Sequence, residues 1–328
     1  MNIKGIYARS VIALVLLISF ATAAERPRLI MFVSIDQMRA DHLKRYASEY
    51  TGGFKRLLTE GVVYLNADLN YANTSTGPGH ATMSTGVYPW KSGIVANNYT
   101  DRTNNRRTYC VEDSSTDKVD GDGGARSPRN LLATTVGDWL KSSSPESKVV
   151  SVSYKDRAAI LMGGHKANYA FWYDRNSGRM ATSSYYTSSI PEWAKVFNGG
   201  GWVKRNVPAV WTKLKDEAVY AKYGPDELEG ESIWHGSTSF PHKLDQEKIL
   251  NQFFSTPWGN TYLLDFARAA LKGENLGARG VTDLLCVSLS TTDNVGSEFG
   301  PNSHEMIDNL LRLDKDLGLF LDELESSY

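Results

Sequence analysis

The chain has 328 residues, of which 41% are hydrophobic and 22% are charged, values typical of a globular protein and not of a disordered, collagenous or coiled-coil one. Lys and Arg number 36 against 37 Asp and Glu, so the formal net charge of -1 gives no chain-wide reason to bind nucleic acid or an anionic membrane. An anionic substrate must therefore be held by local charges.

The two cysteines, Cys110 and Cys286, are too few for a disulfide framework or a thiolate zinc site. The sequence leaves open whether they pair, and Cys286, which stands in an apolar run, favours a buried free thiol.

Residues 1–23 predict a secretory signal peptide. Lys4 and Arg9 precede an apolar run over 11–20, and the small residues of 21–23 fit a cleavage site. Because this run is short for a bilayer span, an uncleaved anchor is the less favoured alternative. We therefore expect a periplasmic or secreted protein with no membrane attachment after the signal is cleaved.

Apolar runs alternate with helical patterns along the rest of the chain. The run over 29–36 predicts a strand buried on both faces of a parallel sheet. After it come predicted helices at 38–50 and 54–60, a strand at 62–65, a helix at 131–140, a strand at 148–153, a helix at 261–271, a strand at 283–289 and a helix at 306–324. This alternation predicts an α/β fold, a three-layer sandwich of helices around a mostly parallel sheet, with its core in 24–164 and 259–328.

Residues 165–258 have a different composition from the rest. They hold six of the eight tryptophans, several Gly and Pro, and little clean periodicity. We expect an aromatic-rich insert packed over one edge of the sheet, where its aromatic side chains either cap a site or fill the insert's own core. Ser, Asp and Gly dominate 114–124, which predicts a mobile loop.

Two carboxylates directly follow predicted strands. Asp36 ends the first apolar run, and Asp293 stands just beyond the strand at 283–289. Ligands of open α/β sheets collect at the carboxyl ends of the strands, so both residues are candidate site residues. The alternative for each is an ordinary cap of the following helix.

A threonine precedes a Gly-Pro-Gly sequence. Thr76 stands before Gly77, Pro78 and Gly79, and Pro78 suits the first turn of a helix. A hydroxyl at a helix N-terminus lies where free N–H groups and the helix dipole favour an anion, which suits a nucleophile that attacks phosphorus. A plain N-cap threonine is the alternative. His80, one turn into the helix, is expected to brace the loop, and a role as a ligand or base is the alternative.

Several motifs, in this order and at compatible spacing, resemble the alkaline phosphatase superfamily. The resemblance is to the branch related to type I phosphodiesterases and nucleotide pyrophosphatases, and within it to bacterial secreted alkaline phosphatases with a threonine nucleophile. It runs from about residue 27 to the end, and its motifs contain Asp36, Thr76, Asn97, Lys155, Arg157 and Asp293.

The resemblance implies two-zinc hydrolysis of small-molecule phosphate monoesters through a phosphothreonine at Thr76. It implies that Asp36 and Thr76 bind one zinc ion and Asp293 the other, and that Asn97, Lys155 and Arg157 hold the phosphoryl oxygens. The charges of Lys155 and Arg157 suit a monoester dianion, and as residues that alternate at a strand end they are expected to share a face. The alternative is that the two are ordinary surface charges. Related phosphodiesterases typically lack this pair, so a monoester is favoured over a diester.

The sequence departs from the family in two places. Ser297 stands where the family has a zinc-binding histidine, and His304 could replace that histidine only if the loop folded back. After the helix at 306–324 the family continues into a strand and an Asp-His-Gly motif, so only Asp36 and Asp293 of its six zinc ligands besides the nucleophile are present. We therefore expect a C-terminally incomplete or degenerate member, with an open sheet edge that promotes association.

Two other functions stay open. One is a phosphodiesterase or nucleotide pyrophosphatase. The other is a noncatalytic relic that binds phosphoesters without turning them over.

Overall fold

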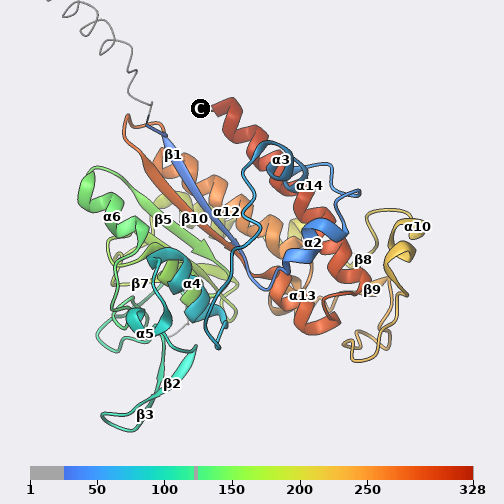
Figure 1. Cartoon of the computed structure of the whole chain (residues 1–328), viewed down its shortest axis with the longest axis horizontal. Helices are drawn as coiled ribbons and strands as arrows, with labels where there is room; N and C mark the ends of the chain where they lie inside the picture. The colour runs from blue at the N-terminus through green and yellow to red at the C-terminus, as the bar shows by residue number, and fades with distance from the viewer. Residues whose placement is uncertain (1–25, 122–124, 328) are drawn as a thin grey trace, which may run out of the picture.

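The computed structural model describes residues 26–121 and 125–327, and its centre is a mixed sheet with helices on both faces (Figure 1). The predicted signal peptide lies outside these residues. The sheet has the strand order β1-β10-β5-β6-β7-β4, formed by β1 (Leu29–Ile35), β10 (Asp283–Leu289), β5 (Val149–Ser153), β6 (Tyr169–Asp174), β7 (Arg179–Ser183) and β4 (Lys118–Val119). The strands β1, β10, β5 and β6 are parallel to one another, and β7 and β4 are antiparallel to their neighbours. The mostly parallel sheet is therefore confirmed.

Helices cover the two faces of this sheet. On one face lie α4 (Thr76–Thr85), α6 (Val136–Ser143) and α7 (Asp156–Gly163). On the other lies α12 (Trp258–Glu274), against which α8 (Glu192–Gly199) and α14 (His304–Ser327) pack; α14 also contacts α3 (Gly53–Glu60) and α13 (Thr291–Phe299). Alternate residues of β10 serve the two faces, since Leu285 and Val287 join the α12 side while Leu284 and Cys286 pack with Met162 of α7. The three-layer sandwich is confirmed.

The remaining elements are short. They are α2 (Ala40–Arg45), α5 (Pro89–Ser92), the hairpin of β2 (Asn98–Asp101) and β3 (Arg106–Tyr109), α9 (Trp202–Asn206), β8 (Val210–Trp211), α10 (Glu217–Tyr220), η1 (Ala221–Tyr223), β9 (His242–Lys243), α11 (Ile249–Gln252) and η2 (Phe253–Ser255). Both cysteines are buried and free, which answers the question that the sequence left open. Within the described ranges, no helix has both the length and the apolar character needed to cross a membrane.

The structure corrects several predicted elements. The predicted strand at 62–65 is wrong: these residues are irregular, and Val62, Tyr64 and Leu65 are 84%, 82% and 88% exposed. An apolar extended run has strand propensity, but it becomes a strand only where a neighbouring strand pairs with it. The predicted helix at 38–50 is reduced to α2, and the one at 131–140 begins only at Val136, because Thr135 caps it through a capping box.

The first strand also differs from its prediction. β1 is an edge strand and is not buried on both faces, since Ile30 and Val33 are 38% and 37% exposed. Continuous apolar sequence therefore does not distinguish an edge from a central strand. No strand of the described residues pairs with the outer edge of β1, and association through this edge stays a prediction.

The range 165–258 does not lie wholly apart from the core. It supplies β6 and β7 to the main sheet, and its aromatic side chains pack into the same large cluster as the sheet and α12. Phe171 and Trp193, for example, both contact Phe266 of α12. Its division from the core as a separate insert, with the boundaries given above, stays a prediction.

Candidate active site

Three neighbouring strands of the sheet end at one place. Asp36 follows β1, and its backbone N–H donates to the carbonyl of Leu289 at the end of β10 at 3.0 Å. Asp293 lies in the first turn of α13, directly after β10, and Lys155 is the N-cap of α7, directly after β5. Since β1, β10 and β5 are adjacent and parallel, their carboxyl ends bring these three side chains together.

The Lys155 ammonium lies between the two carboxylates. Its Nζ is 2.5 Å from Asp36 Oδ2 and also contacts Asp293 Oδ2, and the Lys155 side chain is only 9% exposed. Burial raises the pKa of the Asp36 carboxyl, but the positive charge of Lys155 outweighs it, so the pKa lies below its ordinary value. Asp36 is therefore held ionised.

Thr76 faces this group of charges. It is the first residue of α4, preceded by the N-cap Ser75, and it is 8% exposed. Its Oγ1 donates to Asp36 Oδ2 at 3.3 Å and lies 3.4 Å from both Lys155 Nζ and Arg157 Nη2. The hydroxyl is thus directed at charged groups and does not cap the helix.

Asn97 and Arg157 complete the group. The Oδ1 of Asn97 accepts from the Gly77 N–H at 2.7 Å, so its amide NH₂ is the group that can donate to a ligand. A Cβ at position 77 would lie 3.0 Å from that oxygen and 3.1 Å from Cys110 Sγ, so Gly77 permits the close approach. The buried Nε of Arg157 has no hydrogen-bond partner in the described part of the chain. A buried unpaired donor on a guanidinium whose Nη2 lies 3.4 Å from Thr76 Oγ1 suits an anionic ligand.

Lys155 and Arg157 lie at the start of a helix and not, as the sequence had predicted, at the end of a strand. β5 ends at Ser153, so the two residues do not alternate along a strand. They instead begin α7, where Lys155 is the N-cap and Arg157 lies in the first turn. Their long side chains still converge on Thr76 Oγ1.

His80 and His304 both form contacts with other groups of the protein. His80 is buried, and its Nδ1 and Nε2 lie 2.8 Å from the Thr76 carbonyl and from Ser288 Oγ, so the predicted bracing role is confirmed. His304 instead contacts Asp226 and the Gly224 carbonyl. Ser297 lies one helical turn beyond Asp293 on α13, on the same face. Among residues 26–121 and 125–327, no group of three or more His, Cys, Asp or Glu is arranged to hold a metal ion.

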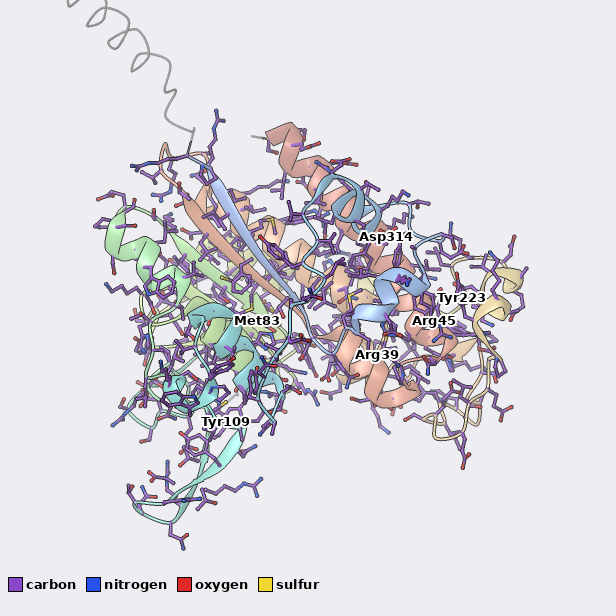
Figure 2. The ribbon with its side chains drawn as sticks, viewed as in Figure 1. Arg39, Arg45, Met83, Tyr109, Tyr223 and Asp314 are labelled. Carbon is purple, nitrogen blue, oxygen red and sulfur yellow. The ribbon has the colours of Figure 1, made fainter. Side chains whose placement is uncertain are left out.

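Two residues of the site carry no signal in the sequence. Tyr109, at the end of β3, donates its hydroxyl to Asp156 Oδ1 at 2.5 Å and accepts from Arg157 Nη1 at 3.2 Å. Figure 2 shows Tyr109 at the base of the β2–β3 hairpin, below α4. Asp156 stands between two predicted residues, but Tyr109 is 48 positions from Arg157 in the chain, and only the fold joins them.

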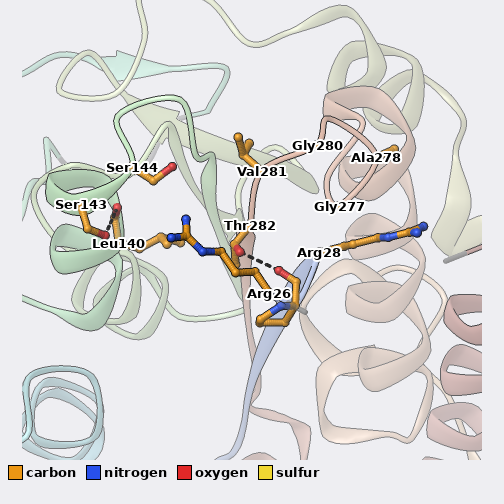
Figure 3. Close-up of a pocket in the computed structure, with 11 residues that line it drawn as sticks. Arg26, Arg28, Leu140, Ser143, Ser144, Gly277, Ala278, Gly280, Val281 and Thr282 are labelled. Atoms are coloured by element: carbon orange, nitrogen blue, oxygen red, sulfur yellow. Dashed lines mark hydrogen bonds between the residues drawn. The ribbon is translucent and has the colours of Figure 1, made fainter. Parts of the chain in front are cut away.

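One pocket lies away from this group of residues. It has a volume of about 750 Å³ and is lined by Arg26, Arg28, Leu140 and the 277–282 turn (Figure 3). Thr282 Oγ1 donates to the Pro27 carbonyl there. Because Leu29 and Asp283 begin β1 and β10, this pocket is at the amino end of the sheet, opposite the carboxyl ends that gather Thr76 and its neighbours.

Comparison with known proteins finds related sequences over most of the chain. The family model of type I phosphodiesterase / nucleotide pyrophosphatase matches residues 30–327. The chain is 42% identical over 316 residues to alkaline phosphatase PhoV of Synechococcus elongatus, covering 94% of this chain and 58% of PhoV. It is 40% identical over 318 residues to alkaline phosphatase PafA of Elizabethkingia meningoseptica, covering 92% of this chain and 57% of PafA.

The fold agrees with these relatives. The crystal structure of wild-type PafA superposes with a TM-score of 0.88 at 38% identity, over 93% of this chain and 61% of the PafA chain. The chain thus spans less than two thirds of the length of the relatives that it matches. Fold, ordered motifs and identity agree, and the chain belongs to the type I phosphodiesterase / nucleotide pyrophosphatase family, in the alkaline phosphatase superfamily.

Proposed function

We propose that this chain carries the nucleophile and the phosphoryl-binding residues of an enzyme that hydrolyses phosphate monoesters. The observation that supports it is the position of Thr76, whose Oγ1 lies 3.3 Å from Asp36 and 3.4 Å from the cationic groups of Lys155 and Arg157. Positive charge around a hydroxyl oxygen favours its ionised form and so its attack on phosphorus.

The proposed reaction has two displacements. In the first, Thr76 Oγ1 forms a bond to phosphorus while the ester P–O bond breaks, and the threonine proton ends on the departing alcohol. In the second, water attacks the phosphothreonine, the bond from phosphorus to Oγ1 breaks, and inorganic phosphate leaves with the hydroxyl of Thr76 restored. The covalent intermediate replaces one difficult displacement by two easier ones.

Three side chains would hold the phosphoryl oxygens. The Oδ1 of Asn97 accepts from Gly77, so the amide NH₂ of Asn97 is the group that can donate to a ligand, and the buried Nε of Arg157 has no partner among the described residues. Nε and Nη2 form one edge of the planar guanidinium, which matches two oxygens of a phosphoryl group. Lys155 adds a point charge beside Thr76, although it also neutralises Asp36 and Asp293. Together these donors suit a dianion, and therefore a monoester.

The resemblance to alkaline phosphatases implies two Zn²⁺ ions, and residues 26–121 and 125–327 do not offer a complete ligand set for either ion. Asp36 and Thr76 would contribute to one ion and Asp293 to the other, whereas a catalytic zinc normally has three protein ligands. Ser297 is a poor substitute for a histidine. Bound zinc would act as a Lewis acid on the phosphoryl oxygens.

The proposed substrates are small phosphate monoesters and not nucleic acid, because the positive groups form one local cluster in a chain of nearly zero net charge. The sequence of 1–23 supports a periplasmic or secreted location.

The test is hydrolysis of p-nitrophenyl phosphate and of bis(p-nitrophenyl) phosphate by the purified chain, with and without added zinc. We expect the monoester to be hydrolysed faster, and Thr76→Ala to abolish turnover. Faster hydrolysis of the diester would indicate a phosphodiesterase or nucleotide pyrophosphatase. Phosphate binding without turnover by the folded chain would indicate a noncatalytic relic, and absence of both would refute the proposal.

A further inference from the structure

Arg157 is held by a closed group of three side chains that the proposed reaction does not use. Arg157 Nη1 donates to the Tyr109 hydroxyl at 3.2 Å, and that hydroxyl donates to Asp156 Oδ1 at 2.5 Å. The other oxygen of Asp156 accepts from Arg126 Nε at 2.8 Å, and the Arg126 guanidinium lies over the Tyr109 ring, 4.8 Å from its centroid. Tyr109 is thus fixed through both its hydroxyl and its ring.

We propose that Tyr109, oriented by Asp156 and Arg126, is a positioning residue for Arg157. It occupies Nη1 and so turns the opposite edge of the guanidinium, formed by Nε and Nη2, toward Thr76. This inference rests on the proposed function for its catalytic consequence, although the positioning itself can be measured without turnover.

The direction of the hydrogen bonds follows from the chemistry of the three groups. An ionised carboxylate only accepts, so the single proton of the Tyr109 hydroxyl goes to Asp156. The oxygen of Tyr109 then has lone pairs free for the N–H of Arg157, which can only donate. Burial, followed by the negative charge of Asp156, raises the pKa of Tyr109, so the phenol keeps the proton that this arrangement needs.

The β2–β3 hairpin joins this group to Asn97. Tyr109 pairs with Asn98 in the ladder, and the Cys110 N–H donates to the Asn97 carbonyl at 2.9 Å. One hairpin therefore places two contributions to the phosphoryl site, the amide of Asn97 and the hydroxyl that holds Arg157. Without that hydroxyl, the Nη1 of Arg157 would lose its partner and the guanidinium could rotate.

Tyr109→Phe removes the hydroxyl and keeps the ring. The matched control is Tyr99→Phe, which removes a hydroxyl from the neighbouring strand of the same hairpin and outside this group. The first measurement is rotation of the Arg157 guanidinium by NMR, with its signals assigned through Arg157→Lys. We expect slow rotation in the wild type and in Tyr99→Phe, and faster rotation in Tyr109→Phe. Equal rates in Tyr109→Phe and the wild type would overturn the inference, whether or not the chain turns substrate over.

The second measurement is binding of inorganic phosphate by calorimetry. Tyr109→Phe is expected to weaken binding roughly tenfold, the effect of one hydrogen bond to a charged group. In an Arg157→Ala background the same substitution should change nothing, because the residue it positions is absent. An equal loss in both backgrounds would overturn the inference. If the wild type neither binds phosphate nor hydrolyses the monoester, the proposed function fails, and the rotation measurement still decides the positioning. Asp156→Asn, which keeps the shape of the side chain, replaces Tyr109→Phe in both measurements should that variant not fold.

Discussion

Gly77→Ala separates the function of the site from the stability of the helix that carries it. The added Cβ would lie 3.0 Å from Asn97 Oδ1, 3.1 Å from Cys110 Sγ and 3.4 Å from Ile94 Cγ2. To restore an ordinary contact, Asn97 must move by about 0.4 Å, which stretches its 2.7 Å hydrogen bond to the Gly77 N–H to about 3.1 Å. The close contacts of the added Cβ lower the stability, whereas alanine is a better helix former than glycine by up to about 1 kcal/mol. Because these two effects oppose each other, we expect little change in the free energy of unfolding.

The expected functional effect is a loss of roughly tenfold in phosphate affinity, which corresponds to about one hydrogen bond. Gly79→Ala is the matched control in the same helix, because its Cβ would meet only the Thr74 carbonyl, at 3.9 Å. Calorimetric titration with phosphate and urea unfolding of both variants make the comparison. Equal phosphate affinities in the two variants would refute the reasoning that Gly77 is needed for the position of Asn97.

Three further predictions concern stability and association. Asp314, which lies on α14 beside α3 (Figure 2) and is 2% exposed, accepts the N–H groups of Thr51, Gly52, Phe54 and Lys55 at 2.7 to 3.3 Å. Asp314→Ala is therefore expected to cost about 3 kcal/mol in urea unfolding, and a cost below about 1 kcal/mol would contradict the capping role. His165 has a pKa raised first by its hydrogen bond to Asp138, so its contribution to stability is fully present below about pH 6.5 and is lost as the pH rises through the folded-state pKa. His165→Gln should then destabilise the chain more at pH 5.5 than at pH 8, and a loss independent of pH would exclude this pair as the cause. Val33→Lys, on the free edge of β1, should reduce self-association in sedimentation velocity, whereas an unchanged distribution would place the contact elsewhere.

The sequence by itself determined which residues end up at strand ends and helix starts. Asp36 and Asp293 follow apolar runs that became β1 and β10, and the Gly-Pro-Gly sequence after Thr76 became the start of α4. These are local properties, since apolar runs, proline and glycine restrict the backbone within a few residues. Because ligands of open α/β sheets collect at the carboxyl ends of strands, the candidate site followed from this local information.

The tertiary structure alone decided how these ends meet. Strand order places β10 between β1 and β5, and this order brings Lys155 between Asp36 and Asp293. Pairing also decided which apolar runs became strands, so 29–35 forms β1 beside β10 while 62–65 stays irregular. Tyr109 joined the site only through the hairpin that also holds Asn97. Pairing and long-range packing depend on residues far apart in the chain, and local patterns carry no information about which of them will be neighbours.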